Sequence, residues 1–107
     1  MVAGQDIVKQ RVLSFYESTR KALPVRKVLL YGSWAKGHPR TDSDIDVAVV
    51  IDDKDHSHRV DIGAKLFHYA FPIDPRIEPR CVFWDEYQHP EPCSILEEII
   101  RTSIEIV

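Results

Sequence analysis

The segment VRKVLLYGSWAKGHPRTDSDIDVAVVI, residues 25–51, decides the fold. It opens with a mostly apolar run at 25–31 and ends with a second one at 44–51. The first has four consecutive apolar residues at 28–31 before Gly32, and the second has apolar side chains at 45, 47, 49 and 51 on one face, so both runs predict strands. Residues 32–43 between them are rich in Gly, Pro and Ser and predict a loop, with one short helical turn at 33–36.

Outside this segment, apolar side chains recur at helical spacing in three stretches, and a fourth stretch has the character of a strand. The predicted elements are a helix over 5–23 with Asp6 as N-cap and Pro24 after it, a helix over 56–70, a strand over 76–84 and a helix over 94–106. Pro79 within the third strand predicts an edge position or a bulge, because proline has no N–H to donate to a neighbouring strand. This order predicts an α/β fold of the α+β kind, with a small mixed sheet of about three strands flanked by helices.

The composition narrows the class of protein. With 107 residues the chain fits one domain, 1–107, and 44% hydrophobic with 29% charged residues is typical of a globular protein. No apolar run approaches the roughly 18 residues that span a bilayer, and no signal-peptide pattern opens the chain, so we expect a cytoplasmic protein without a membrane partner. A net charge of −3 gives no reason to expect direct nucleic-acid binding. Cys81 and Cys93 are too few for a disulfide framework and are expected to be reduced thiols.

Gly32 and Ser33 follow directly after the first strand. A Gly-Ser pair allows a sharp backbone turn, and a helical turn after it directs free N–H groups at one spot. Such a spot suits the phosphates of a nucleoside triphosphate, with the Ser33 hydroxyl as a further donor. Lys36, at the end of the same turn, is a candidate for an additional phosphate contact, although a solvated loop lysine is the more common case.

Two acids open the second strand. Asp44 and Asp46 are two residues apart, so both carboxylates leave the same face of the sheet. Acids in this arrangement can bridge a pair of divalent ions, and Mg²⁺ is the expected guest because it prefers hard oxygen ligands completed by substrate phosphates. Like charges so close together repel one another unless cations are bound.

A third acid from the neighbouring strand would complete this cluster, and the sequence offers two candidates. Glu78 lies near the start of the third strand, where strand parity can bring it level with the two aspartates. Asp74 lies just before that strand in a proline-rich turn, where a structural role is easier to explain. Strand parity favours Glu78, and Asp74 stays open as the alternative.

The run GSWAKGHPRTDSDIDVAVV, residues 32–50, resembles the signature of the polymerase-beta-like nucleotidyltransferase superfamily: Gly-Ser, ten residues, then Asp-x-Asp. The short chain makes it similar to the minimal nucleotidyltransferases, the MNT antitoxins encoded beside HEPN toxins. The motif covers residues 32–46, and the order of elements extends the resemblance over nearly the whole chain.

The resemblance implies a reaction. In this superfamily the two motif carboxylates and a third acid hold two Mg²⁺ ions, here Asp44, Asp46 and Glu78, and the turn at Gly32 and Ser33 binds the triphosphate. An acceptor hydroxyl attacks the α-phosphorus of ATP and pyrophosphate leaves. In MNT antitoxins the acceptor is a tyrosine of the HEPN toxin, and transfer of AMP to it silences the toxin's RNase activity.

Two departures from the superfamily pattern stand out. Trp34 replaces the Arg that many relatives carry after Gly-Ser, and Glu78 replaces a third acid that is often Asp. Trp34 therefore has two possible roles, stacking on the base or packing the loop. Two other functions stay open: an antitoxin that neutralises its toxin by binding alone, and a small-molecule nucleotidyltransferase acting on an aminoglycoside-type acceptor. The motif predicts neither the base preference of the triphosphate nor the oligomeric state, and homo- or hetero-oligomers both fit.

Overall fold

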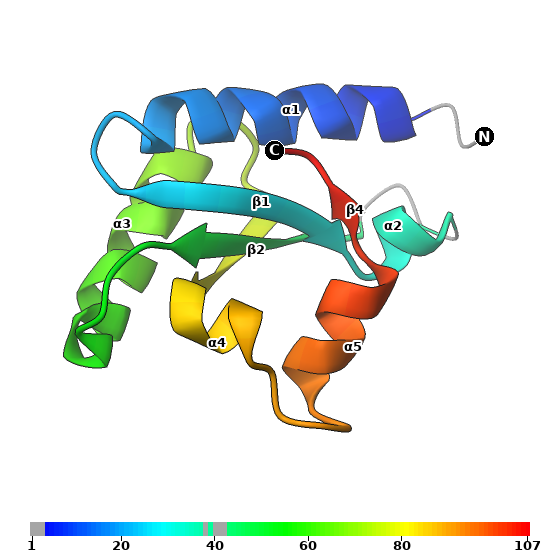
Figure 1. Ribbon diagram of the computed structural model, residues 1–107. Helices are drawn as coiled ribbons and strands as arrows, with labels where there is room; N and C mark the ends of the chain where they lie inside the picture. The colour runs from blue at the N-terminus through cyan, green and yellow to red at the C-terminus, as the bar shows by residue number, and fades with distance from the viewer. Residues whose placement is uncertain (1–3, 38, 40–42) are drawn as a thin grey trace.

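The computed structural model describes residues 4–37, 39 and 43–107. In these residues a four-stranded sheet has helices on both of its faces, with α1 (Gln5–Thr19) above and α4 (Trp84–Gln88) and α5 (Ile95–Thr102) below in Figure 1. The strand order is β3-β2-β1-β4. The predicted fold class, a small mixed sheet flanked by helices, is confirmed, with four strands in the described chain where about three were expected.

The pairing of the strands makes the sheet mixed. The four strands are β1 (Val25–Tyr31), β2 (Ile45–Ile51), β3 (Ile77–Phe83) and β4 (Ile104–Glu105). β1 is antiparallel to both β2 and β4, while β2 and β3 are parallel and are joined by η1 (His56–His58) and α3 (Arg59–Ala70). The loop between β1 and β2, predicted at 32–43, contains α2 (Ser33–Lys36); its residues 38 and 40–42 lie outside the described residues.

Alternation along β2 divides the core into two layers. The odd-numbered side chains of β2 lie in a cluster with side chains of α1 and α3, such as Val12, Phe15 and Leu66. Ala48 and Val50 face the other way and belong to a smaller cluster with Ile99 of α5. Every residue of β2 is buried except Asp46, which is partly exposed, so this polar side chain stands out within an otherwise apolar strand.

β3 is an edge strand, as Pro79 predicted. The N–H of Ile45 donates to the carbonyl of Arg76 at 2.8 Å, so in this parallel ladder the even-numbered residues of β3 bond to β2. Odd-numbered residues, including Pro79, therefore direct their backbone polar groups away from β2, where a missing N–H costs no ladder hydrogen bond. Arg59 donates to the Cys81 carbonyl at 3.0 Å and Glu86 accepts from the Phe83 N–H at 2.9 Å, so side chains cover part of this edge.

The first helix is shorter than expected. It ends at Thr19, not at residue 23, and its N-cap is Gly4, while Asp6 lies in the first turn. The Thr19 hydroxyl donates to the Phe15 carbonyl at 2.7 Å, and the Leu23 N–H donates to the Thr19 carbonyl at 3.0 Å. The residues between Thr19 and Pro24 therefore form a tight turn that leads into β1.

The predicted helix over 94–106 was wrong at its C-terminal end. α5 stops at Thr102, and Ile104 and Glu105 form β4 against β1. The Lys27 ammonium donates to the Glu105 carboxylate at 2.7 Å, and the Ile106 N–H donates to the Val28 carbonyl at 2.8 Å. Pairing with an unsatisfied edge of β1 supplies these residues with partners that a further helical turn does not offer.

The predicted strand over 76–84 was one residue too long at each end, and α4 follows it at once. β3 runs from Ile77 to Phe83, and Trp84 is the first residue of α4. Trp84 stacks on Tyr87 with ring centroids 5.5 Å apart, and the Arg26 guanidinium lies 4.4 Å from the centre of the Trp84 ring. These contacts hold α4 against the sheet.

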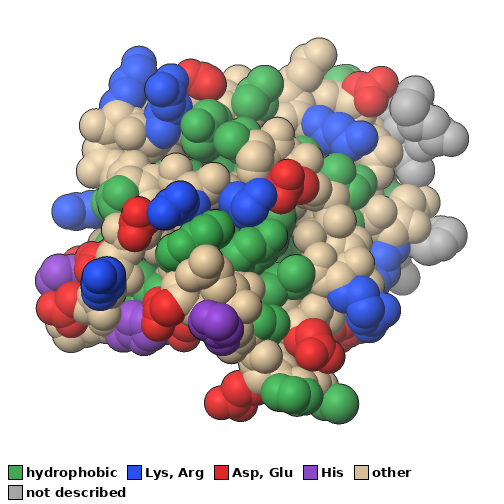
Figure 2. Space-filling model, in the orientation of Figure 1, with side chains coloured by type: hydrophobic (Ala, Val, Ile, Leu, Met, Phe, Trp, Pro, Cys, Tyr) green, Lys and Arg blue, Asp and Glu red, His purple; other side chains and the backbone are tan. Residues whose placement is uncertain are grey.

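Three further expectations concerned membrane spans, surface charge and the two cysteines. None of those helices is both long and apolar enough to cross a membrane. Lys and Arg side chains are interspersed with Asp and Glu side chains on the face shown in Figure 2. Cys81 and Cys93 are both unpaired, and burial raises the pKa of the Cys81 thiol to about 11.

Asp74 links the start of β3 to α1. Its side chain is 5% exposed and accepts from Arg76 at 2.8 Å, while Arg11 of α1 lies 3.6 Å away. These arginines hold the pKa of the Asp74 carboxyl below its usual value, with the Arg76 hydrogen bond as the main cause. Asp74 is therefore fully engaged in structural contacts.

Replacing Asp74 with Asn (D74N) is expected to lower the free energy of unfolding by about 2 kcal/mol at neutral pH. Because the pKa of Asp74 is lower in the folded chain, its ionised carboxylate stabilises the fold at pH values above the unfolded-state pKa near 4. This stability is lost as pH falls through the folded-state pKa. Urea titrations of D74N and wild type should therefore converge at low pH. In the matched control D52N, which removes the exposed Arg26–Asp52 pair, the loss should stay below about 1 kcal/mol. Equal losses in D74N and D52N would contradict the structural role of Asp74.

Candidate active site

Asp46 lies in a row of polar side chains that crosses three strands. It is directly opposite Tyr31 of β1 and Glu78 of β3 in the register of the sheet. Side chains opposite one another on paired strands leave the same face, which here is the α4 and α5 face. Asp44 is exposed and precedes β2 with the same parity as Asp46. The structure therefore brings Asp44, Asp46 and Glu78 to one place, and Asp74, held by its arginines, is not part of it.

The three carboxylates influence one another electrostatically. The pKa of Asp46 is raised above its usual value, first by partial burial and then by the negative charges of Glu78 and Asp44. The Arg80 guanidinium opposes part of this effect. Within the described residues no group of three or more His, Cys, Asp or Glu side chains is arranged to hold a metal ion as it stands. The cluster nevertheless carries an excess of negative charge on hard oxygen atoms, which is the donor chemistry that Mg²⁺ prefers.

Gly32 packs directly against the Asp46 carboxylate. Its φ of +75° and ψ of −153° belong to a region that residues with a side chain rarely adopt. A Cβ placed on Gly32 would collide with Oδ2 of Asp46 and lie 3.2 Å from its Cγ. Glycine is thus needed at this position for two reasons, the backbone conformation and the closeness of the turn to the acid cluster.

Ser33 and Lys36 are the first and last residues of α2, the single helical turn that follows Gly32. The Lys36 N–H donates to the Gly32 carbonyl at 3.1 Å, which closes the turn. Ser33 is partly exposed and directly follows Gly32, the residue that packs against the Asp46 carboxylate. Lys36 is exposed, and no contact in the described chain fixes its ammonium near the carboxylates.

Trp34 packs the loop. Its side chain is 5% exposed and belongs to the main core, and its indole N–H donates to the Ser43 carbonyl at 3.3 Å. Of its two possible roles, packing is the one that the structure supports, because a ring so deeply buried has little surface left for a base. The hydrogen bond to Ser43 also holds the residue that directly precedes Asp44.

Tyr31 and Arg80 belong to the same site and were not expected from the sequence. Burial raises the pKa of the half-buried Tyr31 hydroxyl, while the charge of Arg80 and its hydrogen bond to this hydroxyl lower it. Arg80 is opposite Ala48, whose small side chain leaves room for the guanidinium on this face. For Arg80 the available signal was parity along the strand, because it is two residues after Glu78; Tyr31 enters the site through its pairing with Asp46 across the sheet.

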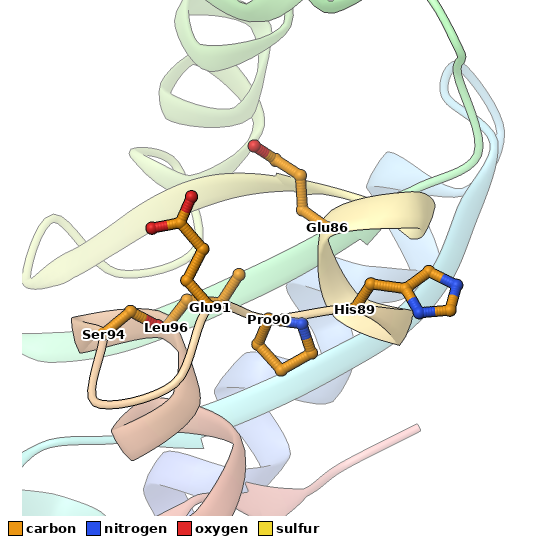
Figure 3. Close-up of a pocket in the computed structure, with 6 residues that line it drawn as sticks. All are labelled: Glu86, His89, Pro90, Glu91, Ser94 and Leu96. Atoms are coloured by element: carbon orange, nitrogen blue, oxygen red, sulfur yellow. The ribbon is translucent and has the colours of Figure 1, made fainter.

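A separate pocket lies near α4. It has a volume of about 260 Å³ and is lined by residues of α4, of the α4–α5 connection and of the start of α5: Glu86, His89, Pro90, Glu91, Ser94 and Leu96 (Figure 3). None of these residues belongs to the acid cluster. We therefore place the candidate active site at the carboxylates and the Gly32 turn, not in this pocket.

Comparisons with known proteins show the family and the fold. The family model for "Polymerase beta, Nucleotidyltransferase" matches residues 15–107. Among solved structures, the chain is similar to a Sulfolobus solfataricus protein provisionally described as a nucleotidyltransferase, with a TM-score of 0.63, 14% identity, and coverage of 95% of this chain and 81% of that one. A toxin-antitoxin structure with AMP-PNP has a TM-score of 0.58, 17% identity, and coverage of 92% and 72%.

At these identities the two structures show a shared fold. A search of curated proteins found no significant match. The family model spans most of the chain and includes the Gly-Ser turn, Asp44, Asp46 and the strand that carries Glu78. The chain therefore belongs to the polymerase beta nucleotidyltransferase family.

Proposed function

We propose that this protein transfers AMP from ATP to a hydroxyl, a tyrosine side chain, of a partner HEPN-type toxin, and so acts as the antitoxin. The observation that carries the proposal is the packing of the Gly32–Ser33 turn against Asp46, in register with Glu78. The family supports nucleotidyl transfer. The similarity to a toxin-antitoxin structure that contains AMP-PNP supports both the adenine nucleotide and the protein partner.

The acid cluster fits two Mg²⁺ ions in its chemistry. Asp44, Asp46 and Glu78 would hold them, since all three are carboxylates, and burial together with the charges of Glu78 and Asp44 already raises the pKa of Asp46. When bound, Mg²⁺ supplies neutralisation of the triphosphate charge and polarisation of the α-phosphate. The donor set is thus suited to a nucleotide that arrives with its metal ions.

The chain's own groups have distinct tasks in this proposal. The backbone N–H and hydroxyl of Ser33 donate to phosphate oxygens, and the conformation of Gly32 lets the phosphates come close to the backbone. Lys36 remains a candidate for a further phosphate contact from the end of α2. Trp34 is buried, and its hydrogen bond to the Ser43 carbonyl links α2 to the residue before Asp44.

The transfer step forms one bond and breaks one. The acceptor oxygen attacks the α-phosphorus, the bond from that phosphorus to the bridging oxygen breaks, and pyrophosphate leaves in line with the attack. The proton of the acceptor hydroxyl passes to a carboxylate of the cluster, for which Glu78 is the candidate because it is exposed and lies directly opposite Asp46. Arg80 lies on the same face and offsets part of the negative charge.

The test is a transfer assay with the toxin encoded beside this protein. Incubation with ATP and Mg²⁺ is expected to raise the intact mass of the toxin by one or more AMP units, and peptide mapping should locate them on tyrosine. The same incubation without Mg²⁺, or with GTP in place of ATP, separates the metal and base requirements. A toxin that forms a tight complex but keeps its mass would refute transfer and would favour an antitoxin that acts by binding alone.

A further inference from the structure

Helix α3 has two apolar faces. Its inner face consists of Ile62, Leu66 and Ala70, which are buried against the sheet and α1. Its outer face carries Val60, Phe67 and Phe71, whose residues are 81%, 51% and 71% exposed. The outer face has no covering element in the described chain, and α3 lies at the edge of the molecule, far from α5 in Figure 1. Large side chains exposed together on one helix face mark an interaction site.

The outer apolar residues follow the spacing of a helix-pairing seam. Val60, Ala64, Phe67 and Phe71 are separated by four, three and four residues, which is the a and d pattern of a heptad repeat. Ala64 is exposed and adjoins Gly63, where a Cβ would meet no described atom within 4 Å. The middle of the seam therefore has a small side chain and open space around it, and the C-terminal half has two large side chains.

We propose that this seam pairs with the α3 helix of a second copy of the chain, with the two helices antiparallel. In antiparallel heptad packing each a residue meets a d residue of the other helix. Val60 then packs on Phe71 of the partner subunit, and Ala64 packs on Phe67 of the partner subunit. Each small side chain meets a large one along the seam. A parallel pair would instead place the phenylalanines on one another and leave a gap between the two Ala64 side chains.

The charges beside the seam favour the same arrangement. Asp61 and His68 are both exposed and flank the seam on one side, at equivalent heptad positions. The antiparallel pair brings Asp61 beside His68 of the partner subunit, twice by symmetry. A parallel pair would place the e positions of the two helices on opposite sides of the seam, so Asp61 would not meet His68 of the partner subunit. Size and charge thus both make this surface complementary to itself.

The pairing leaves the candidate active site open. The inner face of α3 packs on the layer of the sheet that holds Val47 and Val49, whereas Asp46 and Glu78 lie on the opposite face with α4 and α5. The dimer is therefore independent of the proposed transfer reaction.

Sedimentation equilibrium of the full-length chain tests the proposal. We expect a reversible dimer in the micromolar to submillimolar range, and we expect Phe67→Asp (F67D) to raise its dissociation constant at least tenfold. Ile95→Asp is the matched control, because Ile95 is 68% exposed on α5 and should leave the dissociation constant unchanged. Far-UV circular dichroism verifies that both variants fold. A wild-type chain that stays monomeric, or a dimer that F67D leaves intact, overturns the proposal; binding of the toxin that F67D alone abolishes would assign the seam to that partner instead.

Charge exchange tests the direction of the helices. Asp61→Lys alone and His68→Glu alone should each weaken the dimer, because the first removes the carboxylate that faces His68 of the partner subunit and the second places two acids side by side across the antiparallel seam. The double variant D61K/H68E should restore the wild-type dissociation constant to within about threefold. Additive weakening in the double variant overturns the antiparallel arrangement, since parallel helices keep positions 61 and 68 on opposite sides of the seam, where the two substitutions cannot compensate each other.

Discussion

Replacing Asp46 with Asn (D46N) is expected to lower AMP transfer on the order of 10³-fold and, at the same time, to make the folded chain more stable. The loss of transfer follows because Asn keeps the size of the side chain but removes the charge on which cation binding depends. Asp46 is the carboxylate in contact with Gly32 and in register with Glu78, so it is the centre of the proposed site.

The gain in stability has an electrostatic cause. The raised pKa of Asp46 means that the ionised carboxylate is less favourable in the folded chain than in the unfolded one, because of burial and of the charges on Glu78 and Asp44. The stabilising difference between D46N and wild type should therefore be small at low pH, where the wild-type carboxyl is protonated. It should grow as pH rises from the unfolded-state pKa near 4 through the raised folded-state value. Thermal melts without metal across this pH range measure it.

Asp52→Asn is the matched control for D46N. Asp52 follows the other end of β2 and forms an exposed pair with Arg26, so its replacement should leave the transfer rate unchanged. Initial rates of AMP incorporation into the toxin, measured for both variants at saturating ATP, give the comparison. If D46N retained more than a tenth of the wild-type rate, the assignment of this carboxylate to the reaction would be untenable.

The strands around the motif could be predicted from the sequence because local signals agree there. The first strand was expected at residues 25–31 and observed as Val25–Tyr31, since an apolar run lies between Pro24 and Gly32. The second strand differs only in that Asp44 precedes it. Both faces of β2 were also predicted, because strict alternation fixes which side chains share a face.

The C-terminal elements could not be predicted because their partners are distant in sequence. Ile104 and Glu105 have helical neighbours and an apolar pattern that suits a helix, yet they pair with Leu30 and Leu29. Only a free edge of β1 explains this, and no local pattern reveals that edge. α4 was missed for a similar reason, since its position depends on contacts of Trp84 with Arg26.

The candidate site could likewise be predicted only in part, because some of its residues meet through pairing between strands. Parity along the chain selected Asp44, Asp46 and Glu78 as candidates, and the parallel register of β2 and β3 places Glu78 opposite Asp46. Tyr31 and Arg80 enter the site through pairing across strands, which the spacing of one motif does not contain. The apolar residues of the helix predicted at 56–70 also divide in a way that only the structure shows, because α3 carries a buried inner stripe and an exposed outer one.

Replacing Gly32 with Ala (G32A) is expected to reduce transfer at least a hundredfold and to destabilise the fold by roughly 1–3 kcal/mol. Two effects combine: Ala is strained at a φ of +75° with a ψ of −153°, and its Cβ would displace the Asp46 carboxylate. Gly37→Ala separates them, because Gly37 has a similar φ of +78° while its Cβ would meet no described atom within 4 Å. G37A should therefore lose about 1 kcal/mol of stability and keep most of the activity. Urea unfolding and toxin AMP incorporation measure the two quantities, and equal loss of activity in G32A and G37A would show that strain in the turn, and not contact with Asp46, controls the site.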